Sequence, residues 1–221
     1  MRDLILTMSI SIDGCVAGPN GELEWMFGPD QVARAWKLHC ISDASLHIMG
    51  SKTFCDMADY WPTATDAFAQ PMNEIPKAVF SKQGAAFFKP ALASMETEIQ
   101  LSSKSWAEAY VASGDLATEI AKLKAQDGKP IRAHGGAEFA RSIIAENLVD
   151  QYALLVHPVI LGTGLTIFSH VNPLRRLTLI SSTAFPGGSV AQIYKPANTG
   201  ITLTTNDTDA SHAGGVRAFP N

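Results

Sequence analysis

The sequence predicts an α/β protein with a mostly parallel central sheet, flanking helices and an antiparallel C-terminal hairpin. Three apolar strand-like runs each end at a turn that carries glycines or a hydroxyl beside a lysine, and two of these turns lead into a helical pattern. Near the C-terminus, segments 174–182 and 189–194 read as strands on either side of a Pro-Gly-Gly turn. Strands that alternate with helices favour a parallel sheet, and a short turn between two strands favours an antiparallel pair.

Length and composition indicate one domain, residues 1–197, and a polar extension, residues 198–221, which we expect to pack against the domain. The chain is 46% hydrophobic and 17% charged, which suits a folded domain with a full core. With a net charge of −4, the chain has no dominant basic surface, so nucleic acid is not an expected partner. No apolar run approaches the length of a membrane span, so we expect no membrane association.

The cysteines and the N-terminus indicate a cytoplasmic protein. Cys15, Cys40 and Cys55 are scattered and lack the spacing of a metal site, so we expect free thiols in a reducing compartment and no metal. Polar residues at Ser9 and Ser11 interrupt the first apolar run, which makes it a poor signal peptide.

The first strand is expected over residues 4–12, followed by a long glycine-rich loop that reaches Trp25. This loop carries the acids Asp13 and Glu24, and such loops often cover active sites. An ordinary connection between two elements is the alternative. Pro29 then opens a helix whose apolar face is given by the i, i+4 spacing of Val32, Trp36 and Cys40.

Asp30 lies at the start of that helix and has two interpretations. The positive end of the helix dipole favours an acid at this place for structural reasons alone. The alternative is a proton relay beside a substrate.

The next two strands end in turns that suit a phosphate. A strand over residues 45–49 leads into Gly50, Ser51, Lys52 and Thr53, and a brief helix follows. A proline-bearing loop over 61–76 leads to a strand at 77–80, which ends at Ser81 and Lys82. Lysine and hydroxyl groups bind phosphate oxygens, and ligands of open α/β sheets lie at the C-terminal strand ends.

The middle of the chain gives weaker signals. Short strands are expected near 98–101 and within 108–112. Asp115 is expected to cap a helix whose apolar face holds Leu116, Ile120 and Leu123, and the turn at 128–130 ends it.

The segment 130–168 is the strongest functional signal. A strand at 131–134 runs into Gly135 and Gly136, and a helix with an apolar face follows. Glycines at a strand-to-helix turn let backbone amides approach an anion, and the helix start adds unpaired N–H groups. The turn therefore suits a diphosphate, although many tight Gly-Gly turns bind nothing. A further apolar strand over 152–161 ends at the turn 162–164.

Taken in order, these pieces resemble the dihydrofolate reductase superfamily, and more closely the RibD C-terminal (riboflavin biosynthesis reductase) domain family. The resemblance covers about residues 3–196. The matching pieces are 11–14 with Ala17, the loop to Trp25, 49–53, 80–82, 134–136, 148–151, 157–164, Phe168 and 188–194. Riboflavin-pathway members usually carry a lysine on the first strand where this chain has Thr7, which leaves the substrate open.

The resemblance implies an NADPH-dependent reductase and a role for each turn. The turn 135–138 would lie under the cofactor diphosphate, and residues 51–53 would contact the adenosine-side phosphates. Residues 81–82 would hold the adenosine ribose and its 2′-phosphate. Residues 161–164 would lie close to the nicotinamide half of the cofactor. The cofactor residues so implied are Gly50, Ser51, Lys52, Thr53, Ser81, Lys82, Gly135, Gly136, Ala137, Glu138, Leu161, Gly162 and Thr163. Two lysines near one phosphate favour NADPH over NADH.

For catalysis, the resemblance directs attention to the acids Asp13, Glu24 and Asp30, with Trp25 as a substrate contact. It also implies a homodimer. The expected reaction is hydride transfer to a C=N or C=O group of a small heterocycle or imine, with the ribosylaminopyrimidine of riboflavin biosynthesis as a candidate. Two alternatives stay open: dihydrofolate reduction, and a non-catalytic member that binds a nucleotide or serves as a scaffold.

Overall fold

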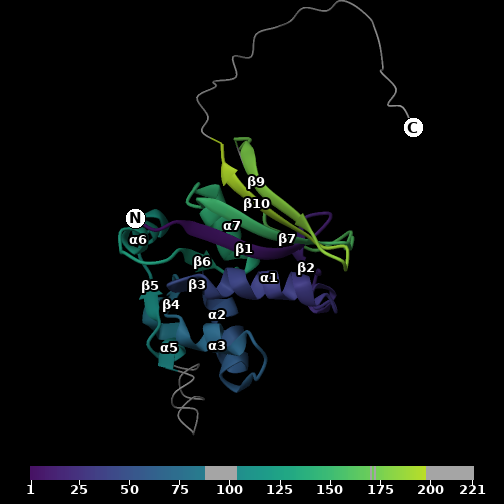
Figure 1. The fold of residues 1–221 in the computed structure, drawn as a ribbon. Coiled ribbons are helices and arrows are strands. Elements are labelled where there is room, and N and C mark those ends of the chain that lie inside the picture. Colours follow the sequence, from purple (N-terminus) through teal and green to yellow (C-terminus); the bar gives the residue numbers. More distant parts are fainter. Residues whose placement is uncertain (88–103, 170, 172, 198–221) are drawn as a thin grey trace, which may run out of the picture.

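The computed structural model describes residues 1–87, 104–169, 171 and 173–197. Within this part of the chain, eight strands form one sheet in the order β5-β4-β3-β6-β1-β7-β10-β9 (Figure 1). Their bounds are β1 Leu4–Ser11, β3 Leu46–Gly50, β4 Lys77–Phe80, β5 Tyr110–Ala112, β6 Ile131–Ala133, β7 Gln151–His157, β9 Leu177–Ala184 and β10 Val190–Pro196. The strands from β5 to β7 pair in parallel, and β10 pairs antiparallel with β7 and β9. The predicted fold class is therefore confirmed.

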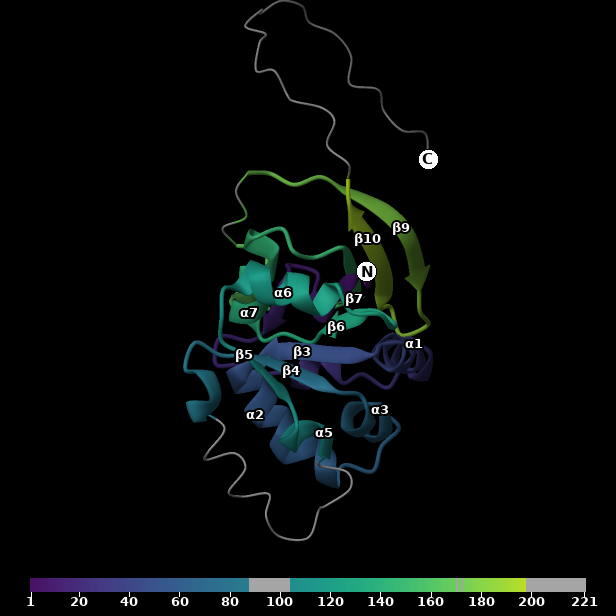
Figure 2. The same ribbon diagram turned by 90° about the vertical axis from the view of Figure 1, so that its left-hand side faces the viewer.

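One face of the sheet is covered by α6 (Leu116–Lys124) and α7 (Ala137–Ala145), which lie together on that side in Figure 2. Alternate residues of the strands point to these helices, and the cluster they form is apolar throughout. Leu4 and Leu6 of β1 and Ile143 of α7 are fully buried in it. Asp115 caps α6 by accepting a hydrogen bond from the Thr118 amide at 2.9 Å, as predicted.

The opposite face is covered by α1 (Gln31–Ser42), α2 (Ser51–Tyr60), α3 (Ala69–Glu74) and α5 (Lys104–Ala107). Its apolar core is divided into two clusters. One lies over β3 and β4 and centres on Met49, Phe54 and Trp106. The other lies over β7 and β10, where Ala33 of α1 packs with Leu155. The central strands β6 and β1 lie between the two clusters.

Two predicted connections hold more structure than expected. The loop after β1 contains β2 (Cys15–Ala17), which pairs antiparallel with β8 (Leu165–Thr166), and the short 3-10 helix Glu24–Met26. The expected loop over 61–76 contains a 3-10 helix, Trp61–Thr63, and α3. Pro71 is the third residue of α3, where its missing N–H costs nothing because first-turn amides have no intrahelical partner.

Two strand boundaries also differ from expectation. The strand predicted over 152–161 ends at His157, because Pro158 follows and cannot donate to a neighbouring strand. The first hairpin strand is Leu177–Ala184 rather than 174–182. The strand expected near 98–101 and the extension 198–221 lie outside the described residues.

Candidate functional site

The turns that follow β3 and β6 meet at the C-terminal edge of the sheet. The Gly50 amide donates to the carbonyl of Gly135 at 3.2 Å. Gly135 has φ +98°, a backbone conformation that favours glycine. A Cβ atom on Gly136 would lie 2.8 Å from Oγ1 of Thr53, so α2 and the second turn approach as closely as glycine permits. The sequence predicted both turns, and the structure brings them together.

Both helices that leave these turns start without a side-chain cap. Gly50 is the N-cap of α2 and Gly136 is the N-cap of α7, and neither helix start receives a side-chain hydrogen bond. Helix N-termini present free N–H groups and the positive end of the dipole. Two such starts side by side form a donor set that fits a diphosphate. Ala137 and Glu138 lie in the first turn of α7, and the Glu138 side chain is exposed.

Two lysines flank this edge. Lys52 is 89% exposed, and its ammonium group contacts Asp56 at 2.8 Å, which raises the pKa of the lysine. An exposed pair of this kind contributes little stability, so the cation is available to a ligand. Lys82 is also exposed and follows β4, the strand next to β3, while Ser81 is buried and its Oγ accepts the Gln83 amide at 3.2 Å.

Asp13 holds the loop that follows β7. Its carboxylate accepts hydrogen bonds from the amides of Leu161 at 3.2 Å and Gly162 at 2.8 Å, and from the Ser11 hydroxyl at 2.6 Å. The Ser11 bond and then the backbone bonds lower the pKa of Asp13. The amide of Thr163 donates to the Leu161 carbonyl at 2.8 Å. The geometry thus gives Asp13 a positioning role, and the backbone amides of three predicted cofactor residues already have partners within the protein.

Asp30 occupies the N-cap of α1 rather than its first turn. One carboxylate oxygen accepts the amides of Val32 at 2.9 Å and Ala33 at 3.1 Å, and the other accepts the Gly187 amide at 2.6 Å. These backbone bonds, that of Ala33 first, lower the pKa of Asp30. The carboxylate therefore joins the start of α1 to the turn between β9 and β10.

The remaining predicted residues lie in the loop before α1. Glu24 accepts the Leu23 amide at 3.1 Å, a bond to its neighbour in the chain. The ring of Trp25 meets the imidazole of His157 edge-on, with the centroids 5.5 Å apart. His157 is the last residue of β7, so Trp25 lies over the same sheet edge as the glycine turns.

Sequence reasoning missed a group of polar side chains beneath α1, called here the polar strip. Its members are Thr7, Ser9, Lys37, His47, Arg132, His134 and His157. The strand residues occupy the alternate positions that point away from the α6 and α7 face, and Lys37 reaches them from α1. The strip centres on β6 and β1, between the two apolar clusters of that face, and reaches β3 at His47 and β7 at His157. Alternation of Thr7, Ser9 and Ser11 in the first strand was the signal that could have revealed it.

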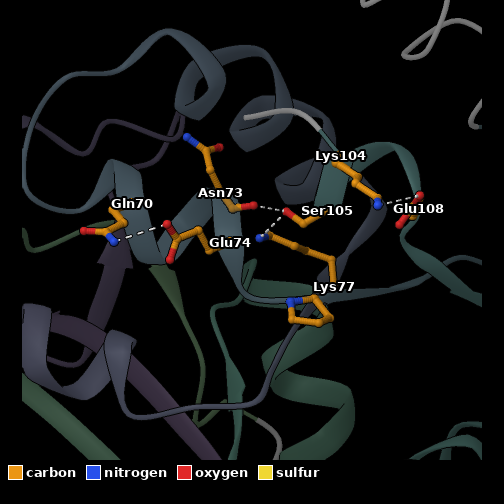
Figure 3. A pocket seen from close by; sticks show the side chains of 8 residues that line it. Gln70, Asn73, Glu74, Lys77, Lys104, Ser105 and Glu108 are labelled. Carbon is orange, nitrogen blue, oxygen red and sulfur yellow. Dashed lines mark hydrogen bonds and ion pairs between the residues drawn. The ribbon is translucent and has the colours of Figure 1, made fainter. Parts of the chain in front are cut away.

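A separate cavity of about 740 Å³ lies at the other end of β4, the strand whose last residue precedes Ser81 (Figure 3). Lys77 lines it, with its ammonium group 4.5 Å from the centre of the Trp106 ring and 2.9 Å from the Ser105 hydroxyl. The same ammonium group donates to the carbonyl of Ile75. Burial lowers the pKa of Lys77 to about 7. None of the predicted site residues lines this cavity, and its lysine is engaged by the surrounding protein.

The sheet order and the paired glycine turns define an α/β domain of the dihydrofolate reductase-like type. The chain belongs to the RibD C-terminal domain family, whose model matches residues 2–191. This is a family of reductase domains, which supports an oxidoreductase.

Known proteins are similar to this chain in sequence or in fold. The uncharacterized protein YyaP of Bacillus subtilis is 28% identical over 194 residues, which cover 87% of this chain and 94% of that protein. A pyrimidine reductase-like protein from Corynebacterium diphtheriae has a similar structure, with a TM-score of 0.60 and 19% identity, covering 89% of this chain and 92% of that one.

A larger solved protein shows the same fold in one part of its chain. It is a diaminohydroxyphosphoribosylaminopyrimidine deaminase/5-amino-6-(5-phosphoribosylamino)uracil reductase from Thermotoga maritima. Its TM-score is 0.61 at 14% identity, and the match covers 89% of this chain and 57% of that protein. This likeness shows the fold alone.

Among the described residues, no helix combines the length and the apolar character that a membrane crossing requires. In that same part of the chain, no group of three or more His, Cys, Asp and Glu side chains is placed to hold a metal ion.

Proposed function

We propose that the protein is an NADPH-dependent reductase that transfers hydride to a C=N or C=O group of a small heterocyclic or imine substrate. The observation that carries the proposal is the pair of uncapped helix starts at Gly50 and Gly136, joined by the bond from the Gly50 amide to Gly135. This arrangement offers backbone donors to a diphosphate. Membership of a reductase domain family supports the same conclusion.

The residues present fit such a cofactor. The turn 135–136 would hold the diphosphate, and α2 would present Ser51 and Thr53 to the adenosine-side phosphates. Lys52 and Lys82, both exposed, would pair with the 2′-phosphate. When bound, the nicotinamide supplies the hydride, and the protein orients it against the acceptor. Asp13 would keep the loop at Leu161 in place, and Trp25 would close the substrate side.

The acceptor that we propose to test first is the ribosylaminopyrimidine of riboflavin biosynthesis. Membership of the RibD C-terminal domain family supports it. Riboflavin-pathway members usually carry a lysine at the position of Thr7, and in this protein a different residue supplies a cation there. Here the Arg132 guanidinium lies 3.3 Å from the Thr7 hydroxyl, so a neighbouring strand places a cation at this position.

Removing the two lysines is expected to reduce NADPH affinity much more than NADH affinity. Each lost charge-assisted contact to a phosphate costs about 1.5–3 kcal/mol, so Lys52→Ala with Lys82→Ala should weaken NADPH roughly 100-fold or more. NADH lacks the 2′-phosphate and should change by less than about threefold. Calorimetric titration of both cofactors measures the difference.

Lys104→Ala is the matched control, because Lys104 is an exposed lysine that pairs with Glu108 at 3.9 Å away from this edge. It should leave both affinities unchanged. Equal losses for NADPH and NADH in the double variant would remove the 2′-phosphate assignment. Binding of neither cofactor to the unmodified protein would contradict the proposed function itself.

We also propose that two copies associate through β9. This strand is an edge of the sheet, and all eight of its residues are exposed. Leu179 and Ile180 are 51% and 54% exposed, which leaves apolar side chains beside unpaired backbone groups. Open edges of this kind pair with other strands unless they are protected.

Introducing lysine into this edge is expected to give a monomer. Ile180→Lys would place a charge in the proposed interface, whereas Val32→Lys, at a residue 55% exposed on α1, should have no effect. Sedimentation equilibrium of the three proteins measures their masses. An unmodified protein that is monomeric at micromolar concentration, or an Ile180→Lys variant that stays dimeric, would contradict this interface.

A further inference from the structure

The polar strip has an unusual charge for the inside of a protein. It contains the cations Lys37 and Arg132 and three imidazoles, and no carboxylate is among its members. Burial lowers the pKa of the Arg132 guanidinium, while the charge of Asp43, which lies outside the strip, raises it by less. Arg132 is 6% exposed and its Nη1 donates to the Thr7 hydroxyl at 3.3 Å. The ammonium group of Lys37 donates to the Ser9 hydroxyl at 3.0 Å. Both cations are therefore held by neutral hydroxyl groups.

The strip also contains unused hydrogen-bonding capacity. In the described part of the chain, four buried side-chain nitrogens lack a partner, and all four belong to the strip: His47 Nδ1, Arg132 Nε, His134 Nε2 and His157 Nε2. An unpaired polar group inside a protein costs about 1–3 kcal/mol, and nearly all such groups are paired in folded proteins. His47 Nε2 donates to the Ile41 carbonyl at 3.0 Å, so the free Nδ1 of this ring is an acceptor and does not serve an oxyanion. The other three nitrogens can donate, and together they indicate a place that receives a partner from outside the chain.

The strip borders the cofactor edge. Its members Lys37 and His134 are only partly buried, whereas Arg132 and His47 are buried. His134 directly precedes Gly135, and His157 lies under Trp25 at the end of the adjoining strand β7. A ligand that enters beside the glycine turn would meet the strip first at His134 and Lys37.

We propose that the polar strip is an oxyanion-binding subsite, which takes a phosphate or carboxylate group of the substrate between α1 and strands β1 and β6. A guanidinium, an ammonium and hydroxyl donors are the groups that bind oxyanions in proteins. Burial lowers the pKa of Lys37 to about 8, so its ammonium form still predominates at neutral pH. The identity of the ligand as a reductase substrate rests on the proposed function, whereas the binding of an oxyanion does not.

Uridine 5′-monophosphate is a suitable probe, with uridine as its neutral counterpart and inorganic phosphate as the bare oxyanion. We expect the nucleotide and phosphate to bind and uridine to bind at least about tenfold more weakly. Calorimetry at pH 7 measures all three. If uridine binds as well as the nucleotide, the site recognises the ring, and the oxyanion assignment is overturned. If neither the nucleotide nor phosphate binds, the assignment is overturned as well.

The helix starts at Gly50 and Gly136 also attract phosphate. Variants must therefore show whether the nucleotide binds at the polar strip or at these helix starts. Lys37→Met should weaken the nucleotide at least about tenfold, and Lys37→Arg should restore most of the affinity. Arg34→Gln is the control, since Arg34 lies one turn earlier on α1 and pairs with Asp66 at 3.2 Å. It should change the affinity by less than about twofold. Thermal melting of each variant confirms that it folds.

The same variants distinguish this proposal from the proposed function. Lys52→Ala with Lys82→Ala should weaken NADPH but not the nucleotide, and Lys37→Met should do the reverse. If the Lys52→Ala, Lys82→Ala variant instead loses affinity for the nucleotide, the nucleotide binds at the helix starts. That result overturns the subsite. If the unmodified protein binds the nucleotide but does not bind NADPH, that result counts against the cofactor assignment alone and leaves the subsite standing.

Discussion

Gly136→Ala is expected to weaken NADPH binding roughly 10- to 100-fold while the domain still folds. The added Cβ atom would lie 2.8 Å from Oγ1 of Thr53, so the turn must move away from α2. Overpacking of this kind typically costs 1–3 kcal/mol. The movement would separate the two helix starts whose amides are proposed to share the diphosphate. Calorimetric titration with NADPH measures the loss.

A second variant tests this reason directly. Thr53→Ala removes the atom that the new Cβ would meet, so Gly136→Ala should cost less NADPH affinity in a Thr53→Ala background than in the unmodified protein. Gly28→Ala is the neutral control, because a Cβ atom at Gly28 would have nothing within 4 Å. If Gly136→Ala binds NADPH as well as the unmodified protein does, the close approach of the turns is not required.

Acidification is expected to destabilise the fold between pH 6.5 and about 3. Burial lowers the pKa of His47 from 6.5 to about 3, and the nearby Lys77 and Arg132 act in the same direction. In this window the unfolded chain binds a proton that the folded chain does not, so the free energy of unfolding falls as pH falls. One such group contributes about 1.4 kcal/mol per pH unit. Burial also lowers the pKa of His134, whose ring lies 4.4 Å from that of His47.

Urea unfolding at pH 6.5 and pH 5 measures this effect, with about 2 kcal/mol expected from His47 alone. His47→Gln should reduce the difference between the two pH values, whatever its effect on stability at pH 6.5. His39→Gln is the matched control, because His39 is an exposed histidine on α1. A difference that persists unchanged in His47→Gln would mean that other groups cause it.

The local turns could be predicted from the sequence because glycine is the residue that such backbone conformations favour. Gly135 requires a conformation with positive φ, and the helices after Gly50 and Gly136 follow from apolar spacing. The order of the strands could not be predicted in this way. β6 lies between β3 and β1, which are far from it in the chain, and that order depends on packing across the whole sheet.

Side-chain roles were harder to predict than positions. The sequence shows Asp30 only as an acid at the start of a helix. It does not show that its second carboxylate oxygen accepts the Gly187 amide, which is far away in the chain. The polar strip joins Lys37 on a helix to Ser9 and Arg132 on two strands, so no local pattern contains it. Pro71 made α3 resemble a loop, although a proline in the first turn is compatible with a helix.

The bond from the Gly187 amide to Asp30 also bears on how the chain can be engineered. The tip of a hairpin at a sheet edge is ordinarily a good place to insert a peptide tag or to open new chain ends. Here the tip carries the donor that helps to fix the beginning of α1. An insertion at 186–188 would therefore disturb the helix that covers the ligand face.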